Sequence, residues 1–516
     1  MAFSKTPTVD TYSSVRVPMA WDLALNSVPS TDDYSLISGL TNMVPYKKVD
    51  AENELYSETR YGLFGSGVTT GSSKITRGCY VWEKTATETY YFVVVLDGVL
   101  TTVYSSTDGT AWAVANTFTE AKTTTVRFTE FINSSNVKTL VLVTGTKGYI
   151  YTTNAAGTEI TDVDFPTPHV PFPVFLDGYL FLAKESTGDI YNSNLDNPAA
   201  WTAGDFISSE MYPDDIKALL KIQNYVLAVG TEGSEFFYDA ANATASPLAR
   251  VSGGSLPIGT VYPDSIASSL DRATFLATTN DGGMSMAVIE GTNYKLLPAE
   301  VLLHIFTNQI RNGKIVGTGC RGAFLRMQGE VFYIFNFSGD TNGFDADANY
   351  TLMYSFNTKK WIRLVVNFSN RYPVFYTNQG NSKSPLTFVC GHTTDGVFFG
   401  TTSAGSPSDV FFGISYQIRQ EILVPPQTFG TMNLKAMGRA GLYYINSFDL
   451  IAASLLWSDD NCQTWSDPRD FSGTMASNFP FITQLGMFRS RAFKVVLQGN
   501  SSQVYYLECD INKGMR

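Results

Sequence analysis

The sequence predicts an all-β protein: a β-propeller-like array of hairpin blades with an N-terminal arm, short inserted helices and a C-terminal β-sandwich domain. Aromatic residues make up 14% of the 516-residue chain and glycines number 42, a composition that favours short strands joined by tight turns. Turn glycines recur at a spacing of roughly 40 to 57 residues, which is the length of a four-stranded propeller blade. Only 16% of the residues are charged, so uncharged polar side chains must form much of the surface.

Charge and composition also exclude several classes of protein. The formal net charge is −11 and the Lys and Arg residues are dispersed, so tight nucleic-acid binding, which needs several cations against phosphates, is not expected. No apolar run approaches the ~20 residues that span a bilayer, and the N-terminus lacks a secretory signal pattern. The cysteines have no C-x-x-C spacing, so we expect neither a zinc site nor a disulfide framework, and no cofactor. They are Cys79, Cys320, Cys390, Cys462 and Cys509.

Residues 1–75 are expected to form an arm that packs along a larger body. The segment has scattered prolines and a glycine-rich stretch at 62–71, but it also carries apolar residues such as Trp21 and Tyr34. A solvated tail, the alternative interpretation, would not need these apolar anchors. The glycine-rich stretch lacks the lysine of a phosphate-binding loop and is interpreted as a turn.

Residues 76–404 carry a repeated unit, in which an apolar strand meets a glycine turn and an aromatic-rich strand leaves it. The first copy runs through Tyr90–Leu96, the turn at Gly98, and Val99–Tyr104. Its regular period favours a propeller of six or seven blades, an architecture that hides strand edges; an unspecific run of hairpins is the alternative. The later copies span 139–151, 178–201, 225–238, 273–297, 331–361 and 386–400.

Two stretches within this region have helical spacing. Asp214–Ile222 carries Ile216, Leu219 and Leu220 at positions that could share one helix face, and Pro298–Arg311 shows a stronger pattern. Both are expected to be short helices inserted between blades.

The composition changes at Ser403–Ser408, which predicts a linker. The alternating strands that follow are expected to form an antiparallel sandwich. The predicted organisation is therefore an N-terminal arm at 1–75, a β-propeller at 76–404 and a C-terminal β domain at 407–516.

Two stretches resemble the Asp-box turn, S-x-D-x-G-x-T-W. In such a turn an Asp carboxylate accepts backbone N–H groups, a glycine supplies an unusual dihedral angle and a tryptophan anchors the loop. The second copy is the sharper one, although Cys462 occupies its glycine position. We interpret both copies as structural turns away from any chemistry. The residues concerned are Ser105, Asp108, Gly109 and Trp112 in the first copy and Ser458, Asp460, Thr464 and Trp465 in the second.

No catalytic constellation is expected. His169 lies among prolines, His304 lies beside an apolar helical stripe and His392 lies at a strand end, so no nucleophile–base pair with an orienting third group is evident. Residues 340–347 are oxygen-rich like a calcium loop but lack the spacing and the closing glutamate of an EF-hand. The protein is predicted to be no enzyme and to hold no metal.

Several motifs occur in an order that resembles one known family. They are the stretch 212–238, which ends in Gly230–Tyr238, the element Trp457–Ser466, and Met487–Val495. Over roughly residues 170–510 the chain is similar to the tail hub proteins of short-tailed bacteriophages, also called nozzle or packaged-DNA stabilisation proteins. The first 75 residues depart from that pattern.

The resemblance implies a structural protein of the phage tail, made in the host cytoplasm and located in the virion. It implies a homohexameric ring that extends the DNA exit channel below the portal and its adaptor and helps to retain packaged DNA until ejection. The implied partners are copies of the chain, the adaptor or head–tail connector, and needle, fibre or spike proteins. Contact with genomic DNA in the channel would be weak or transient, because a ring of acidic subunits repels DNA.

Two other functions stay open. A sialidase-like or glycan-binding β-propeller of a phage tail would need an arginine cluster for a carboxylate and a Tyr–Glu pair at the propeller centre. Arg321, Arg326, Arg363 and Arg371 fall in adjacent predicted blades and could supply that cluster. A cytosolic propeller scaffold is the third possibility.

Overall fold

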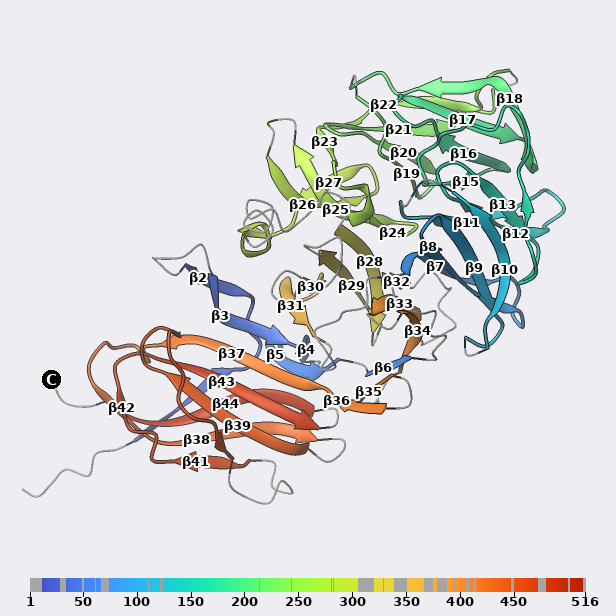
Figure 1. Cartoon of the computed structure of the whole chain (residues 1–516). Coiled ribbons are helices and arrows are strands. Elements are labelled where there is room, and N and C mark those ends of the chain that lie inside the picture. The colour runs from blue at the N-terminus through green and yellow to red at the C-terminus, as the bar shows by residue number, and fades with distance from the viewer. Residues whose placement is uncertain are drawn as a thin grey trace, which may run out of the picture.

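The computed structural model combines a β-propeller with a β-sandwich, as the sequence predicts (Figure 1). The structure describes residues 12–27, 34–48, 51–60, 62–65, 74–109, 111–120, 122, 124–212, 214–242, 244–279, 281, 283–304, 320–327, 329–337, 350–365, 375–377, 388–393, 396–403, 408–411, 414–446, 450–471, 479–499 and 502–513. Figure 1 shows the sandwich strands gathered at the opposite end of the molecule from the middle blades of the propeller.

The first four blades are antiparallel sheets whose four strands follow one another along the chain. Blade one contains β7 (Ile75–Glu83), β8 (Thr89–Asp97), β9 (Leu100–Ser106) and β10 (Ala113–Thr119). Blade two contains β11 (Arg127–Ile132), β12 (Lys138–Val143), β13 (Gly148–Tyr151) and β14 (Thr158–Glu159). Blade three contains β15 (Val174–Leu176), β16 (Tyr179–Ala183), β17 (Asp189–Asn194) and β18 (Asn197–Ser208). Blade four contains β19 (Ala218–Ile222), β20 (Tyr225–Val229), β21 (Ser234–Asp239) and β22 (Leu248–Leu256).

The remaining blades are less regular. Blade five contains β23 (Ile258–Gly259), the 3₁₀ turn η1 (Pro263–Ser265), β24 (Ala267–Ser268), β25 (Arg272–Thr279), β26 (Met284–Glu290) and β27 (Asn293–Leu296). Blade six contains β28 (Cys320–Met327), β29 (Glu330–Phe337), β30 (Tyr350–Ser355) and β31 (Lys360–Leu364). Blade seven contains β32 (Phe375–Thr377), β33 (Phe388–Thr393), β34 (Gly396–Ser403), β35 (Ser408–Phe411) and β36 (Ile414–Gln417).

Central strands of the blades are apolar on both faces because each blade packs against a neighbour on either side. In β12, Leu140 and Leu142 enter the core shared with blade one, whereas Val141 and Val143 enter the core shared with blade three. A strand buried on both faces reads as a continuous apolar run. This packing explains the apolar runs on which the blade prediction rests.

The seven blades within the described residues form a closed ring. Neighbouring blades contact one another near the centre, and β32 of blade seven contacts β7 of blade one. The N-terminal segment supplies a further strand, β6 (Gly62–Gly65), which pairs antiparallel with β34 and parallel with β35. The outer edge of β34 is therefore covered by a strand from the other end of the chain.

The sandwich consists of two sheets around one large core, to which side chains of blade six such as Phe332 and Ile362 also contribute. One sheet contains β1 (Ser13–Pro18), β4 (Met43–Lys48), β5 (Ala51–Thr59), β38 (Lys435–Asn446), β41 (Phe481–Thr483), β42 (Met487–Phe488) and β44 (Ser502–Lys513). The other contains β2 (Ala24–Ser27), β3 (Tyr34–Thr41), β37 (Arg419–Gln427), β39 (Leu450–Ser458), β40 (Arg469–Asp470) and β43 (Arg491–Gly499).

Strands of the first 60 residues join the sandwich to the propeller. β1 and β5 both pair with β44 in one sheet of the sandwich. β3 pairs with β37 in the other sheet, and its last residue, Thr41, pairs in parallel with Arg363 of β31 in blade six. Hydrogen-bonded sheets thus cross the predicted boundaries, and the division into folding units at 1–75, 76–404 and 407–516 stays a prediction.

The expected helix at Asp214–Ile222 is wrong, because Ala218–Ile222 forms β19, the inner strand of blade four. Leu219 and Leu220, two of the residues that suggested one helix face, point to opposite faces of that strand, and both are buried. Short apolar runs do not distinguish a helix from a doubly buried strand. Of the helix expected at Pro298–Arg311, residues 300–304 are helical and 305–311 lie outside the described residues.

The predicted linker at Ser403–Ser408 connects two strands of one sheet. Ser403 ends β34 and Ser408 begins β35, and both strands pair with β6. No helix in the part of the chain that the structure describes is long and apolar enough to cross a membrane.

Candidate functional site

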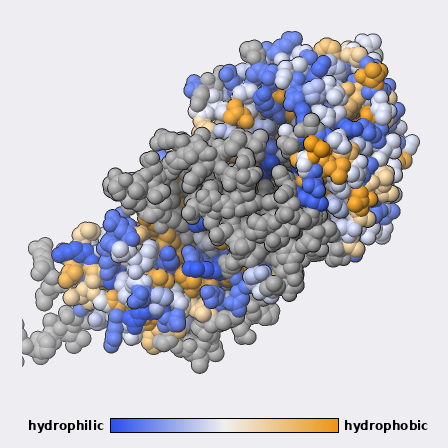
Figure 2. Space-filling model, in the orientation of Figure 1, coloured by the Kyte–Doolittle hydropathy of each residue, from blue (hydrophilic) through white to orange (hydrophobic). Residues whose placement is uncertain are grey.

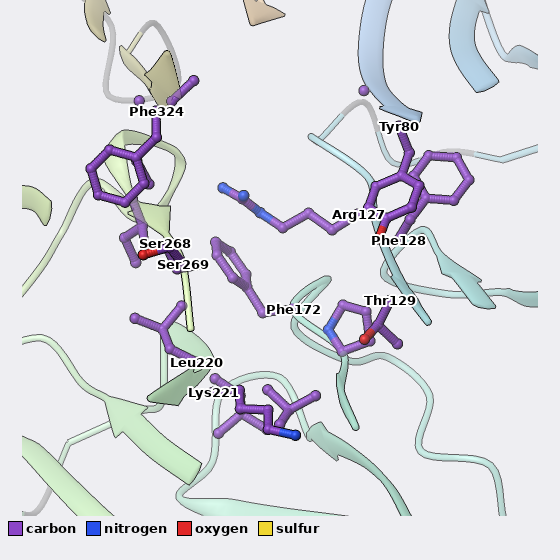
Figure 3. Close-up of a pocket in the computed structure, with 18 of the residues that line it drawn as sticks. Tyr80, Arg127, Phe128, Thr129, Phe172, Leu220, Lys221, Ser268, Ser269 and Phe324 are labelled. Atoms are coloured by element: carbon purple, nitrogen blue, oxygen red, sulfur yellow. The ribbon is translucent and has the colours of Figure 1, made fainter. Parts of the chain in front are cut away.

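The inner strands of the propeller surround a cavity of about 590 Å³ (Figure 3). Its lining comes from blades one to six, and includes residues of β7, β11, β15, β19, β24 and β28. Aromatic side chains form much of the wall, with charged groups between them. A volume of this size is typical of sites for small molecules.

Arg127 is the charged residue that reaches furthest into this space among those labelled in Figure 3. It is the first residue of β11, and the alternation of side chains along that strand sends its neighbour Phe128 into the core between blades one and two. The guanidinium Cζ lies 3.9 Å from the centre of the Phe172 ring, which is a cation–π contact. The Arg127 Nε is buried and has no hydrogen-bond acceptor among the described residues.

The surroundings of Arg127 are electrostatically unfavourable for its charge. The pKa of the Arg127 guanidinium is lowered to about 10, mainly by burial; the Asp264 carboxylate opposes this effect and the positive charge of Arg321 adds to it. Asp264 itself is paired with Arg321, whose Nη1 lies 2.8 Å from its carboxylate. The guanidinium is still charged at neutral pH, so it presents a cation to the cavity.

Positive charges outnumber negative ones on the lining, in contrast to the net charge of −11 of the whole chain. Arg272 lines the same cavity, but it is paired with Glu290 at 3.1 Å. The cationic residues of the lining are Arg127, Lys221, Arg272, Arg321 and Arg326, and the acidic ones are Glu130, Asp264 and Asp271.

A tyrosine and a glutamate also meet at the cavity wall. The Tyr80 hydroxyl donates a hydrogen bond to Glu130 Oε1 at 3.2 Å, and both residues line the cavity. Burial raises the pKa of Tyr80 well above its usual range and also raises the pKa of Glu130. Tyr80 is therefore a neutral phenol, poorly suited to act as a nucleophile.

Two of the four arginines considered from sequence line the cavity, namely Arg321 and Arg326. Arg363 lies on β31, the outer strand of blade six, and Arg371 lies outside the described residues. Sequence reasoning missed Arg127 and Tyr80. In the sequence, these two residues could be identified only as polar residues on the first strand of a blade. Side chains on one face of that strand point toward the propeller axis.

The second Asp-box turn lies between β39 and β40 in the sandwich. Asp460 Oδ1 accepts hydrogen bonds from the Ser458 hydroxyl at 2.7 Å and from the backbone N–H of Thr464 at 3.0 Å. Hydrogen bonds from the Thr464 hydroxyl and, to a smaller extent, from the Thr464 backbone N–H lower the pKa of Asp460. Cys462 occupies the glycine position at φ 68°, so the turn keeps its backbone shape without glycine. Trp465 is half-buried, with Lys494 Nζ 4.7 Å from its ring centre.

The first Asp-box turn connects β9 and β10 of blade one. Asp108 Oδ1 accepts from the Ser106 hydroxyl at 2.9 Å, and Gly109 has a φ of 72°. Ser105 has a different role from the one expected, because its hydroxyl donates to the Asn154 carbonyl of blade two at 2.6 Å. Trp112 packs on the small apolar cluster of the same blade. None of these residues lines the cavity.

His169 is buried and serves the fold. The backbone N–H of Gly145 donates to its Nε2 at 3.2 Å, so Nδ1 carries the proton and donates to the Pro166 carbonyl at 2.8 Å. Burial lowers the pKa of His169 to about 4.

The other two histidines and the predicted calcium-like loop give no site among the described residues. His304 is the last described residue of the helical segment, and the side chain of His392 and residues 340–347 lie outside the described residues. Within that description no three His, Cys, Asp or Glu side chains are grouped as metal ligands.

The family model described as "Bacteriophage P22 Gp10, beta-propeller" matches residues 30–312. No curated protein matches the chain.

The solved structures whose backbone resembles that of this chain share little sequence identity with it. Virginiamycin B lyase from Staphylococcus aureus is 9% identical with a TM-score of 0.40, and the match covers 68% of this chain and 99% of that one. A streptogramin B lyase is 10% identical with a TM-score of 0.42, over 66% and 98% of the two chains. YCF48 bound to D1 peptide is 13% identical with a TM-score of 0.36, over 68% and 97%. At these scores nothing about this chain follows from them.

Proposed function

The chain belongs to the bacteriophage P22 Gp10 β-propeller family of phage structural proteins, and from this premise we propose that it forms a ring of six copies in the tail of a short-tailed phage. The ring extends the DNA exit channel below the portal and its adaptor and helps to retain the packaged genome until ejection. Its partners are the adaptor and the needle, fibre or spike proteins of the tail. The subunit has no enzymatic role in this proposal, is made in the host cytoplasm and resides in the virion.

The observation that carries the proposal is the family match together with an architecture in which a propeller and a sandwich are joined. Blade six shares the core of the sandwich, through side chains such as Phe332 and Ile362, whereas blades three to five have a core of their own. A subunit with a propeller at one end and a sandwich at the other can make different contacts along a tail axis. This arrangement suits a protein that must hold neighbours in its ring and also proteins above and below it.

The surface supports contacts between subunits. Figure 2 shows hydrophobic residues scattered among hydrophilic ones over the visible face of the propeller and the sandwich. Large apolar side chains that are exposed in the isolated chain lie on the third and fourth strands of several blades, where a neighbouring subunit can cover them. They include Leu100, Val114, Phe206, Tyr238 and Leu296.

The conduit role predicts weak binding to DNA. The alternative is a ring in which Arg489 and Arg491 of each copy grip the duplex, and the contacts of these two arginines argue against it. Arg491 is buried, and its Nε and Nη2 donate to the Asp459 carboxylate at 2.7 Å each. Arg489 donates from Nη1 to the Met432 carbonyl at 3.1 Å. A ring that grips DNA through these two arginines would first have to break these contacts.

The mass of the assembled particle tests the proposal. Mass photometry of the purified protein, alone and with the adaptor of the same phage, should find a species of six times the 56.7 kDa chain, and negative-stain images should show closed rings. Titration with duplex DNA at physiological salt should give dissociation constants of about 10⁻⁴ M or weaker. A protein that stays monomeric in the presence of the adaptor contradicts the ring, and micromolar, salt-sensitive DNA binding contradicts the conduit.

A further inference from the structure

We propose that the central cavity of the propeller binds a small organic molecule through an anionic group, a carboxylate or a phosphate, which Arg127 holds. The inference is independent of the ring, since it concerns a site within one subunit.

The first argument is the unused hydrogen-bonding capacity of Arg127. Buried donors in folded proteins nearly always have an acceptor, and an unpaired buried charge is costly. Arg127 has a buried Nε with no acceptor, and no ion pair joins its guanidinium to a carboxylate within the part of the chain that is described. An oxyanion that accepts from the guanidinium would satisfy these donors in the planar, two-pronged geometry that arginine prefers.

The second argument is the fixed position of the guanidinium. Its contact with the Phe172 ring holds it within the cavity (Figure 3). The nearby Asp264 carboxylate is already paired with Arg321, so it does not neutralise both arginines. Arg127, Arg321 and Asp264 together therefore keep one net positive charge, which an anion beside Arg127 would neutralise.

The third argument is the shape and chemistry of the walls. Figure 3 places Phe324, Ser268 and Ser269 on the side of the cavity that faces Arg127. Tyr80 and Glu130 add polar groups at the wall of blades one and two. Aromatic faces alternating with hydroxyl and carboxyl groups suit a ring with polar substituents, such as an acidic monosaccharide or a phosphorylated sugar.

Binding can be measured on the intact protein with simple probes. We would use isothermal titration calorimetry at constant ionic strength. The carboxylate probes are N-acetylneuraminate and glucuronate, and the phosphate probes are inorganic phosphate and glucose 6-phosphate. Glucose is the neutral reference. At least one charged probe should bind saturably, and glucose should bind at least about tenfold more weakly than that probe. Binding of the carboxylates alone identifies a sugar acid as the ligand class, and binding of the phosphates alone identifies a phosphate ester.

Two matched variants assign the site. Arg127→Met should weaken binding of the charged probe at least about tenfold, because it removes a charge-assisted hydrogen-bond donor. Lys295→Met is the control, since Lys295 is exposed, lies outside the cavity lining and is paired with Glu290, and the affinity of this variant should stay within about twofold of wild type.

The stability of Arg127→Met without ligand separates binding from a structural role. Removing a half-buried charge that has no ion-pair partner among the described residues should leave the melting temperature nearly unchanged. The proposal is overturned if no charged probe binds, if Arg127→Met binds it as wild type does, or if this variant is markedly less stable than wild type.

Discussion

Arg60 and Asp409 form a buried, bidentate salt bridge between the N-terminal arm and blade seven. Nη1 and Nη2 of Arg60 lie 2.8 and 2.6 Å from the two Asp409 carboxylate oxygens, and both side chains are almost fully buried. Arg60 Nε also donates to Asn42 Oδ1 at 3.0 Å, and Nη2 donates to the Val365 carbonyl at the end of blade six. One guanidinium thus ties together the arm, blade six and β35 of blade seven.

Removal of this guanidinium should strongly destabilise the protein. In Arg60→Met the Asp409 carboxylate stays buried without its partner, so the free energy of unfolding should fall by about 3–5 kcal/mol. Chemical denaturation measures this change. Lys48→Met is the control, because the Lys48–Glu54 pair is exposed and contributes at most about 1 kcal/mol. A loss of under about 1 kcal/mol in Arg60→Met would show that this junction does not hold the fold together.

The buried His169 should make stability depend on pH. Its pKa is lowered to about 4 in the folded state and is about 6.5 in an unfolded chain, so between these values only the unfolded chain binds the proton. Stability should therefore fall as the pH drops from about 6.5 to about 4, by about 3 kcal/mol in all from this group.

Unfolding of wild type and His169→Gln across this pH range checks the sign. The variant should lose the part of the pH dependence that His169 causes, whereas His304→Gln, at an exposed position, should keep it. Equal pH dependence in wild type and His169→Gln would contradict the assignment.

The blades were predictable from sequence because their signal is local. The run Tyr90–Leu96, the turn at Gly98 and the strand that leaves it became β8 and β9, paired as a hairpin. The partner of β34 was not predictable, because β6 lies more than 300 residues earlier and its glycine-rich sequence reads as a turn. Pairings between segments so far apart leave no periodic pattern in either of them.

The cavity was only partly predictable. A central site with an arginine cluster follows from the propeller architecture, and Arg321 and Arg326 do line the cavity. The identity of Arg127 as the unpaired cation depends on which neighbouring carboxylates are already occupied, here Asp264 by Arg321. That information is three-dimensional, so spacing along the chain cannot supply it.

The Asp-box turn of the sandwich should contribute stability that acid removes. Hydrogen bonds to its carboxylate hold the pKa of Asp460 below its usual value, so the contribution is present above about pH 4 and is lost as the pH falls further. Asp460→Asn should melt at a lower temperature than wild type at pH 7, and the difference should shrink below pH 4. Asp467→Asn, an exposed neighbour, should melt as wild type does at both pH values. A difference that stays constant with pH would mean that the carboxylate charge does not stabilise the turn.

Truncations test where the propeller ends. The pairings of β6 with β34 and β35 predict that a fragment of residues 60–417, which keeps the Arg60–Asp409 pair, folds better than one of residues 76–404, which lacks both covering strands. Without them the edge of β34 is open to pairing with other chains, so the shorter fragment should aggregate more and melt at a lower temperature. The soluble fraction after expression and the thermal unfolding midpoint of the two fragments measure the difference. The same reasoning predicts that residues 407–516 alone are poorly soluble, because β44 loses β1 and β5, and β37 loses β3. Equal solubility and melting of the 60–417 and 76–404 fragments would restore the boundaries at 76 and 404 and reduce β6 to an accessory strand.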